Sequence, residues 1–142
     1  ALVPDLGPLV TDPEVEVRRD VVYLLRQIDG AAVFPLLRQS LTDSDEEVRA
    51  RAVEVLVRRA DTSDETIAAL AVAVEDRAAK VRRNAIDALG KLLKVGTPAV
   101  LKALETAQED DDKKVAERAG VAFRKLTPKE PKKAAPRAKK RK

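Results

Sequence analysis

DRAAKVRRNAIDALGKL, residues 76–92, has a spacing that recurs in three other segments of the chain. In each copy an aspartate stands five residues before a valine, and in most copies an arginine follows that valine. The aspartate and valine pairs are Asp12 and Val17, Asp43 and Val48, Asp76 and Val81, and Asp110 and Val115, and the arginines are Arg18, Arg49 and Arg82, with Ala116 in the last copy. Successive valines are 31, 33 and 34 residues apart. Self-similarity at such a period is typical of a repeat array.

Apolar residues also recur upstream of each valine, which predicts a first helix before the second helix that carries the valine. Fourteen residues before the valine stand Val3, Phe34, Ile67 and Leu101, and eleven before it stand Leu6, Leu37, Leu70 and Leu104. One helix pair cannot bury both of its apolar faces, so neighbouring pairs must stack. The sequence therefore predicts an all-α array of about four helical hairpins over residues 1–126, with repeats at about 1–29, 30–61, 62–95 and 96–126.

Local signals predict where individual helices begin and end. A short helix is expected over residues 2–10, although Pro8 inside it would cost a backbone hydrogen bond. Capping and proline signals at residues 11–14 start the next helix, which is expected over residues 14–28 with Leu24 and Leu25 on its buried face.

Three further expectations concern the later repeats. Asp64 is a candidate N-cap for the first helix of the third repeat. The last helix is expected to end near Leu126. Residues 127–142 contain Lys, Pro and Ala without periodicity, which predicts a disordered basic tail.

The composition limits the chemistry that the chain can carry. Among 142 residues there is no His, Cys, Met or Trp, and aromatic residues make up 2%. Neither a histidine base nor a thiolate nucleophile is available, and acid clusters such as Asp43 to Glu47 are interpreted as helix-start charge. We therefore expect a protein that is not an enzyme, with no cofactor, metal site or small-molecule substrate. No apolar run reaches the length of a membrane span, and a cytoplasmic location, or association with a nucleoid or nucleus, is the expectation.

Charge is unevenly distributed along the chain. The formal net charge is +4. Residues 127–142 hold eight Lys and Arg against one Glu, a net charge of +7, which leaves −3 for the rest of the chain. A mildly acidic array is thus predicted to carry a strongly basic tail.

The repeat resembles the HEAT-repeat family of α-solenoids, most closely its bacterial variants. The residues that carry the resemblance are Leu36-Leu37 to Leu41 in the first helix, the segment from Asp43 to Ala52, and Ala88-Leu89-Gly90 at the end of the second helix. Four such motifs in register cover residues 2–126. The resemblance implies a right-handed α-solenoid in which the second helices line the concave face.

The resemblance also implies a role for the recurring Asp and Arg. In the family these side chains are described as bonding across to adjacent repeats, which assigns that role to Asp12, Asp43, Asp76 and Asp110 with Arg18, Arg49 and Arg82. Ala116 departs from the pattern, and this departure indicates a C-terminal capping unit.

If the second helices face inward, five positions around each valine should project into the concave groove: one before it, and two, three, six and ten after it. These positions include Ala50 and Gln27 as well as charged residues, and their summed charge becomes more positive toward the tail. The predicted partner-binding residues are Arg19, Tyr23, Arg51, Glu54, Arg58, Lys80, Arg83, Asp87, Lys91, Lys114, Arg118 and Lys125.

Two functions fit this surface. The first is a non-enzymatic scaffold that binds a protein partner in the groove. The alternative is a nucleic-acid-associated protein that holds DNA or RNA phosphates through the basic C-terminal half and tail. The tail residues predicted for the alternative are Lys132, Lys133, Arg137, Lys139, Lys140, Arg141 and Lys142. Neither function predicts base-specific contacts, because no aromatic platform is visible in the sequence.

Overall fold

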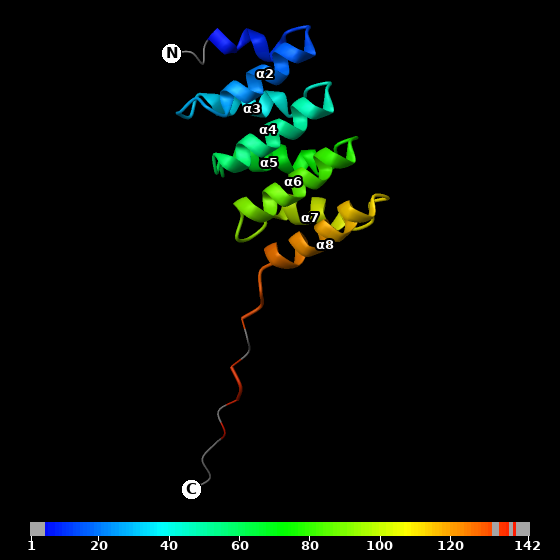
Figure 1. Ribbon diagram of the computed structural model, residues 1–142. Coiled ribbons are helices and arrows are strands. Elements are labelled where there is room, and N and C mark those ends of the chain that lie inside the picture. Colours follow the sequence, from blue (N-terminus) through cyan, green and yellow to red (C-terminus); the bar gives the residue numbers. More distant parts are fainter. Residues whose placement is uncertain (1–4, 132–133, 137, 139–142) are drawn as a thin grey trace.

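The protein is a stack of helical hairpins in the computed structural model, which describes residues 5–131, 134–136 and 138 (Figure 1). The elements in chain order are a 3₁₀ helix η1 (Pro8–Thr11) and the helices α2 (Val15–Leu25), α3 (Val33–Ser40), α4 (Glu46–Arg58), α5 (Asp64–Ala73), α6 (Ala79–Leu92), α7 (Pro98–Ala107) and α8 (Lys113–Leu126). Across these ranges there is no strand, so the predicted all-α solenoid is confirmed. No helix in the same ranges is long and apolar enough to cross a membrane.

The helices form two layers. The second helices α2, α4, α6 and α8 pack in series against one another, while η1, α3, α5 and α7 form the other layer. Each first helix also packs against the second helix of its own repeat, as α5 does against α6. The layers follow from the two apolar stripes of each hairpin, one toward its partner helix and one toward the next repeat.

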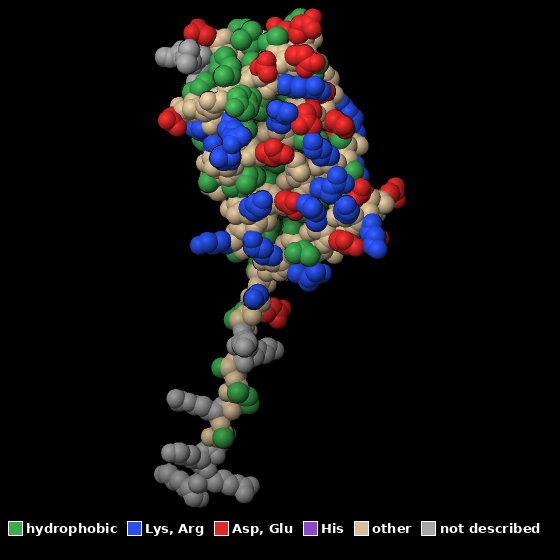
Figure 2. Space-filling model, viewed as in Figure 1, with side chains coloured by type: hydrophobic (Ala, Val, Ile, Leu, Met, Phe, Trp, Pro, Cys, Tyr) green, Lys and Arg blue, Asp and Glu red, His purple; other side chains and the backbone are tan. Residues whose placement is uncertain are grey.

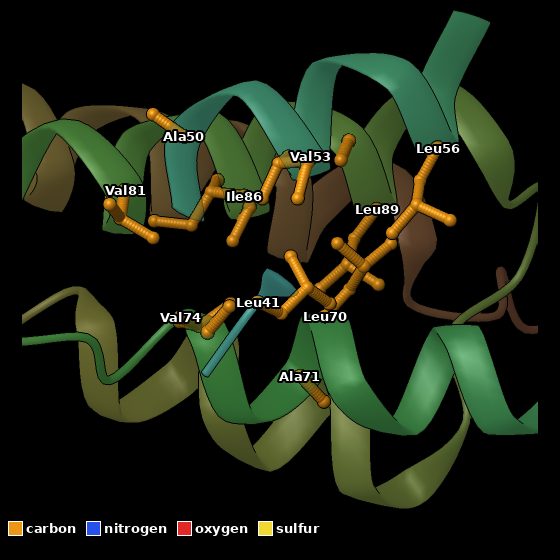
Figure 3. Packing of buried hydrophobic residues seen from close by; sticks show 14 of the residues in the cluster. Leu41, Ala50, Val53, Leu56, Leu70, Ala71, Val74, Val81, Ile86 and Leu89 are labelled. Carbon is orange, nitrogen blue, oxygen red and sulfur yellow. The ribbon is translucent and has the colours of Figure 1, made fainter. Parts of the chain in front are cut away.

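Aliphatic residues fill the space between the layers. Leu70 of α5 meets Ile86 and Leu89 of α6 there, and these three side chains are fully buried (Figure 3). Val48, Val81 and Val115 of the repeated motif are buried as well. Val17 is only half-buried, because it lies in the first repeat, which is packed on one side only. The hydrophobic effect over this continuous core is what holds the repeats together.

An Arg–Asp ladder joins each repeat to the next, as the resemblance implied. In each rung the Nε of the arginine lies close to Oδ2 of the next repeat's aspartate: Arg18 to Asp43 at 2.7 Å, Arg49 to Asp76 at 2.7 Å and Arg82 to Asp110 at 2.8 Å. Each arginine also donates from Nη1 to the carbonyl oxygen of the aspartate in its own repeat. Such charge-assisted bonds fix the rotation of one hairpin on the next.

The ladder aspartates also shape the turn before each second helix. In all four repeats Oδ1 accepts the backbone N–H two residues later at 2.8 Å, which holds the turn in place. For Asp76, burial raises the pKa of the carboxyl, but the hydrogen bonds from Arg49 and the N–H of Ala78 outweigh it and hold the pKa below its ordinary value.

Several predicted helix ends are wrong at the N-terminal side. Of the helix expected over residues 2–10, Asp5 and Leu6 are helical, and from Pro8 the chain continues as the 3₁₀ helix, because proline has no N–H to continue an α-helix; residues 1–4 lie outside the described part. The helix expected over residues 14–28 ends at Leu25, where the N–H of Gln27 bonds to the carbonyl of Leu24 in a tight closing turn. Leu24, which was expected to be buried, is exposed.

The later boundaries agree more closely with the sequence. Ser63, and not Asp64, caps α5 by accepting the N–H of Thr66, and Asp64 is the first helical residue, where its charge suits the helix dipole. The last helix ends at Leu126 as predicted. The described residues beyond it belong to no helix or strand and lead away from the stack (Figure 1).

Candidate functional site

The second helices contact one another more extensively than the first helices do. Contacts between α4 and α6 and between α6 and α8 are more extensive than those between α3 and α5. Small residues allow this close approach: Ala88 and Ala122 are buried, and a Cβ placed on Gly90 would lie 4.0 Å from that of Ala122. The second helices were predicted to line the concave side of the stack, and we call the outer surface of this layer the concave face.

A groove of about 530 Å³ crosses α2, α4 and α6 on this face. It has an apolar floor that includes Val53, Val57 and Ala88, and a rim of polar side chains. Six of the predicted partner-binding residues line it: Tyr23, Arg51, Glu54, Arg58, Asp87 and Lys91. Tyr23, one of the few aromatic residues in the chain, is 53% exposed. The groove thus combines an apolar floor with polar groups, as binding sites commonly do.

The other six predicted partner-binding residues lie outside the groove. They are Arg19, Lys80, Arg83, Lys114, Arg118 and Lys125. Arg19 and Arg83 are half-buried and bind the next repeat: Arg19 Nη2 lies 2.9 Å from Asp45 Oδ2, and Arg83 Nη1 lies 3.2 Å from Asp112 Oδ2. These two arginines therefore strengthen the junctions between repeats.

Ala50 occupies the same repeat position as Arg19 and Arg83, and its predicted place in the groove is wrong. It is fully buried, since this position faces the neighbouring second helix. The aspartate partner is missing at that junction too, because Ala78 stands where the other junctions have Asp45 and Asp112. The junction between the second and third repeats has small residues where its neighbours have an ion pair.

Many cations of the concave face are neutralised by acids on the same face. Lys80 Nζ lies 2.7 Å and Arg51 Nε lies 3.1 Å from Glu47, and both hydrogen bonds lower the pKa of the Glu47 carboxyl, Lys80 having the larger effect. Arg118 pairs with Asp87. Figure 2 shows the result, with Lys and Arg side chains interspersed among Asp and Glu. The basic gradient predicted along the groove is therefore interrupted at its centre.

Three cations without an ion pair among the described residues lie at the C-terminal ends of the second helices. Arg58 and Lys91 lie in the last turns of α4 and α6, and Arg26 caps α2. All three are exposed and line the groove. They form a row across three successive repeats at one side of the groove.

Sequence reasoning missed Arg26 and the valine floor. It assigned the last groove position of the first repeat to Gln27, which does not line the groove, because α2 ends at Leu25 and the tenth position no longer lies on a helix face. The missed valines, Val53 and Val57, stand four residues apart on the same face of α4, where both pack against the core and also line the groove.

The acid clusters have structural partners. Asp45 and Asp112 accept the N–H of Val48 and Val115 and so cap α4 and α8. The Arg19 guanidinium, more than this cap, holds the pKa of Asp45 below its ordinary value. Over the described residues no three acidic side chains are grouped to hold a metal ion. The tail residues predicted to bind nucleic acid, Lys132, Lys133, Arg137, Lys139, Lys140, Arg141 and Lys142, lie outside the described part.

Comparison with known protein families gives one match that spans most of the chain. The family model described as HEAT repeats matches residues 1–57 and 35–124. A comparison with curated proteins finds no match.

Solved structures share the fold. Human deoxyhypusine hydroxylase in complex with glycerol superposes with a TM-score of 0.67 at 26% identity, over 87% of this chain and 43% of that chain. A computationally designed armadillo repeat protein for modular peptide recognition gives 0.65 at 22% identity, over 89% of this chain and 65% of that chain. An engineered protein gives 0.62 at 22% identity, over 87% and 62%. The chain thus spans less than two thirds of each of these structures.

Proposed function

The chain belongs to the HEAT-repeat family, and from that premise we propose that it is a binding scaffold whose groove over α2, α4 and α6 holds a segment of a protein partner. The observation that carries the proposal is the groove itself, about 530 Å³ in volume and bordered by the half-exposed ring of Tyr23. Aromatic side chains at a concave surface offer large contact area at little cost in conformational entropy.

The charges of the groove favour a partner segment with acidic residues. Arg26, Arg58 and Lys91 form a row with no ion pair to neutralise them in the described part of the chain. Adjacent second helices lie roughly 8–10 Å apart, a distance that carboxylates three residues apart in a polyproline II segment can match, since that conformation has three residues per turn and rises about 9 Å in each turn. An apolar or aromatic residue of the segment would then contact Tyr23 and the valine floor.

Binding accounts for this surface better than catalysis does. The chain has no His or Cys, and the acids of the concave face, such as Glu47 and Asp87, are engaged in ion pairs. The likeness to human deoxyhypusine hydroxylase covers 43% of that enzyme's length. This likeness supports a shared fold, and we propose that the chain uses this fold as a scaffold.

Selection of peptides from a random displayed library against the chain tests the proposal. A groove variant with Tyr23→Ala, Arg58→Glu and Lys91→Glu should weaken the selected peptides at least about tenfold, or about 1.4 kcal/mol. The matched control carries Val72→Ala, Lys94→Glu and Lys102→Glu, exposed positions that do not line the groove. Equal affinity of both variants, or an equal loss in both, would contradict the proposal.

The second candidate is nucleic-acid binding through the last repeat and tail. The observation that favours it is that Lys113 and Lys114 of α8 are exposed and make no described ion pair, close in the chain to the basic residues 127–142. Titration of duplex DNA at two salt concentrations, with and without residues 127–142, separates the candidates. Binding that depends on the tail and falls steeply with salt supports the second candidate; binding of DNA that is insensitive to both contradicts it.

A further inference from the structure

One residue in each repeat stands at the same place on the concave face, six positions after the motif valine. These four residues are Tyr23, Glu54, Asp87 and Val121. The first three line the groove, whereas Val121 of α8 lies beyond it. Because the repeats stack in register, the four side chains form a row that crosses all four second helices. We call it the central row.

The middle of the central row is engaged in bonds within the protein. Arg118 pairs with Asp87, and the side-chain amide of Asn84 donates to Glu54 Oε1 at 3.3 Å. In both bonds the residue three positions after one motif valine reaches the row member of the preceding repeat. A partner that crosses the middle of the row therefore has no need to supply cations for these two acids.

The two ends of the central row are apolar and exposed. Tyr23 is 53% exposed and Val121 is 59% exposed. The position itself is open, because Glu54 is exposed and Asp87 is partly exposed inside the stack. Burial of either apolar side chain by a partner would be favourable. The row thus offers one apolar contact at each end, with neutralised acids between them.

A cation stands beside the second apolar end. Lys125 lies in the last turn of α8, as Arg58 does in α4 and Lys91 does in α6, and all three stand ten positions after their motif valines. The ammonium of Lys125 donates to the carbonyl oxygen of Gly90 and makes no ion pair among the described residues. The row of cations at the side of the groove therefore continues onto α8, where Lys125 and Val121 are one helical turn apart.

We propose that Val121 and Lys125 form a second subsite for the partner segment, which is acidic and carries two apolar residues, one for Tyr23 and one for Val121. This inference rests on the proposed function of the groove. Three steps between adjacent second helices separate the ends of the central row by about 24–30 Å. Three turns of polyproline II, about nine residues, cover that distance. Acids spaced one turn apart between the apolar residues would face the cations.

Displayed peptide libraries test the spacing. In each library two Trp residues stand five, nine or thirteen positions apart in a random background rich in Asp and Glu. The nine-position library should be enriched on the chain at least about fivefold over the other two, since two contacts reinforce each other most when the connecting segment matches the distance between their sites. Equal enrichment of the three libraries would contradict the spacing.

The fluorescence of peptide Trp then measures affinity directly, because the chain has no Trp. Val121→Ser should weaken the selected peptides at least about fivefold. Val72→Ser, at an exposed position of α5 in the other layer, is the matched control and should leave affinity unchanged. Replacement of the peptide Trp that contacts Val121 should cost about the same factor and make the peptide insensitive to Val121→Ser.

The cation is tested on the same helix. Lys125→Gln should weaken the peptides at least about threefold and reduce the dependence of their affinity on salt. Lys113→Gln, at the exposed start of α8, is the matched control and should do neither.

The outcomes separate this inference from the groove itself. Peptides that lose affinity in the triple groove variant, but keep it in Val121→Ser and Lys125→Gln, would overturn the second subsite and leave the groove as the site. Peptides that bind all these variants equally would overturn both proposals. If no library were enriched and duplex DNA bound in a way that Lys125→Gln weakens, the choice of a peptide as the occupant would be wrong.

Discussion

The two ends of the stack are built from the same repeat but end differently. At the C-terminal end α8 packs on α6 and α7, Leu126 is fully buried, and its carbonyl accepts the N–H of Gly96 at 2.9 Å. At the N-terminal end α2 packs on α4 and on a short 3₁₀ helix, and Leu24 is exposed. We call the C-terminal end, where Leu126 is buried, the closed end, and the N-terminal end, where Leu24 is exposed, the open end.

The difference shows that burial in this array is set by neighbours more than by the motif. Val17 and Val115 stand at the same place in their repeats, yet Val17 is half-buried and Val115 is fully buried. In a stack where each repeat contacts only its neighbours, stability is a sum of hairpin and junction contributions. The ends should therefore respond to substitution differently from the middle.

The largest effect is expected from removing a ladder aspartate inside the stack. Asp76→Ala leaves the guanidinium of Arg49, a residue that is 2% exposed, without its carboxylate partner, and should lower the free energy of unfolding by about 3–5 kcal/mol. Asp12→Ala removes only the bond from the N–H of Glu14 and should cost about 0.5–1.5 kcal/mol. Urea unfolding measures both, and equal costs would remove the distinction between the open end and the internal junctions.

Two adjacent leucines in α2, Leu24 and Leu25, differ in burial at the N-terminal end of the stack. Leu25 is fully buried, so Leu25→Ala should cost about 2–5 kcal/mol through lost burial and the cavity left behind. Leu24→Ala should change stability by no more than about 0.5 kcal/mol. Thermal unfolding of the two variants provides the comparison, and a large cost for Leu24→Ala would mean that another part of the chain covers it.

The junctions should also make stability depend on pH. Hydrogen bonds hold the pKa of Asp45 and Asp76 below their ordinary values. Stabilisation from a lowered carboxyl pKa is fully present above the ordinary value of about 4 and is lost as pH falls through it toward the lowered value. Unfolding in urea at pH 7 and pH 3 should show this loss, and Asp76→Asn should reduce it. A wild-type chain that becomes more stable toward pH 3 would contradict this assignment.

The smallest effect is expected at the closed end. Ala116→Arg restores the motif but places the guanidinium where the described residues offer no aspartate of a following repeat, so stability should change by no more than about 0.5 kcal/mol. Arg82→Ala, at the same repeat position one junction earlier, should cost at least about 1.5 kcal/mol. If Ala116→Arg raised the free energy of unfolding by as much as Arg82→Ala lowers it, the new arginine would have a partner at the C-terminal end, which would contradict this account.

Much of this fold could be predicted because the repeat imposes one geometry four times. The period placed the hairpins, and the recurring Asp and Arg, through the family resemblance, indicated the ladder. The end of the first helix was mispredicted, because Pro8 interrupts the apolar pattern and the chain continues there as a 3₁₀ helix.

The groove was predicted less well than the fold. Helical periodicity gives the face on which a residue lies, but not how close the next helix comes, and so it placed the buried Ala50 in the groove. It also gives no pairing between repeats, and the neutralisation of Lys80 and Arg118 by acids of neighbouring repeats was missed. One signal for this pairing was available in the sequence. Where the residue two positions after the motif valine is an arginine, as at Arg19 and Arg83, the next repeat has an aspartate three positions before its valine, Asp45 or Asp112. Where that residue is Ala50, the next repeat has Ala78 instead.

Native-state hydrogen exchange tests the contrast between the two ends most directly. If the N-terminal junction is open and the C-terminal end is closed, the free energy of opening measured for the amides of α2 should be at least about 1 kcal/mol lower than that for the amides of α8. The amides of α4 and α6 should be the most protected. Protection of α2 equal to or above that of α8 would contradict the account.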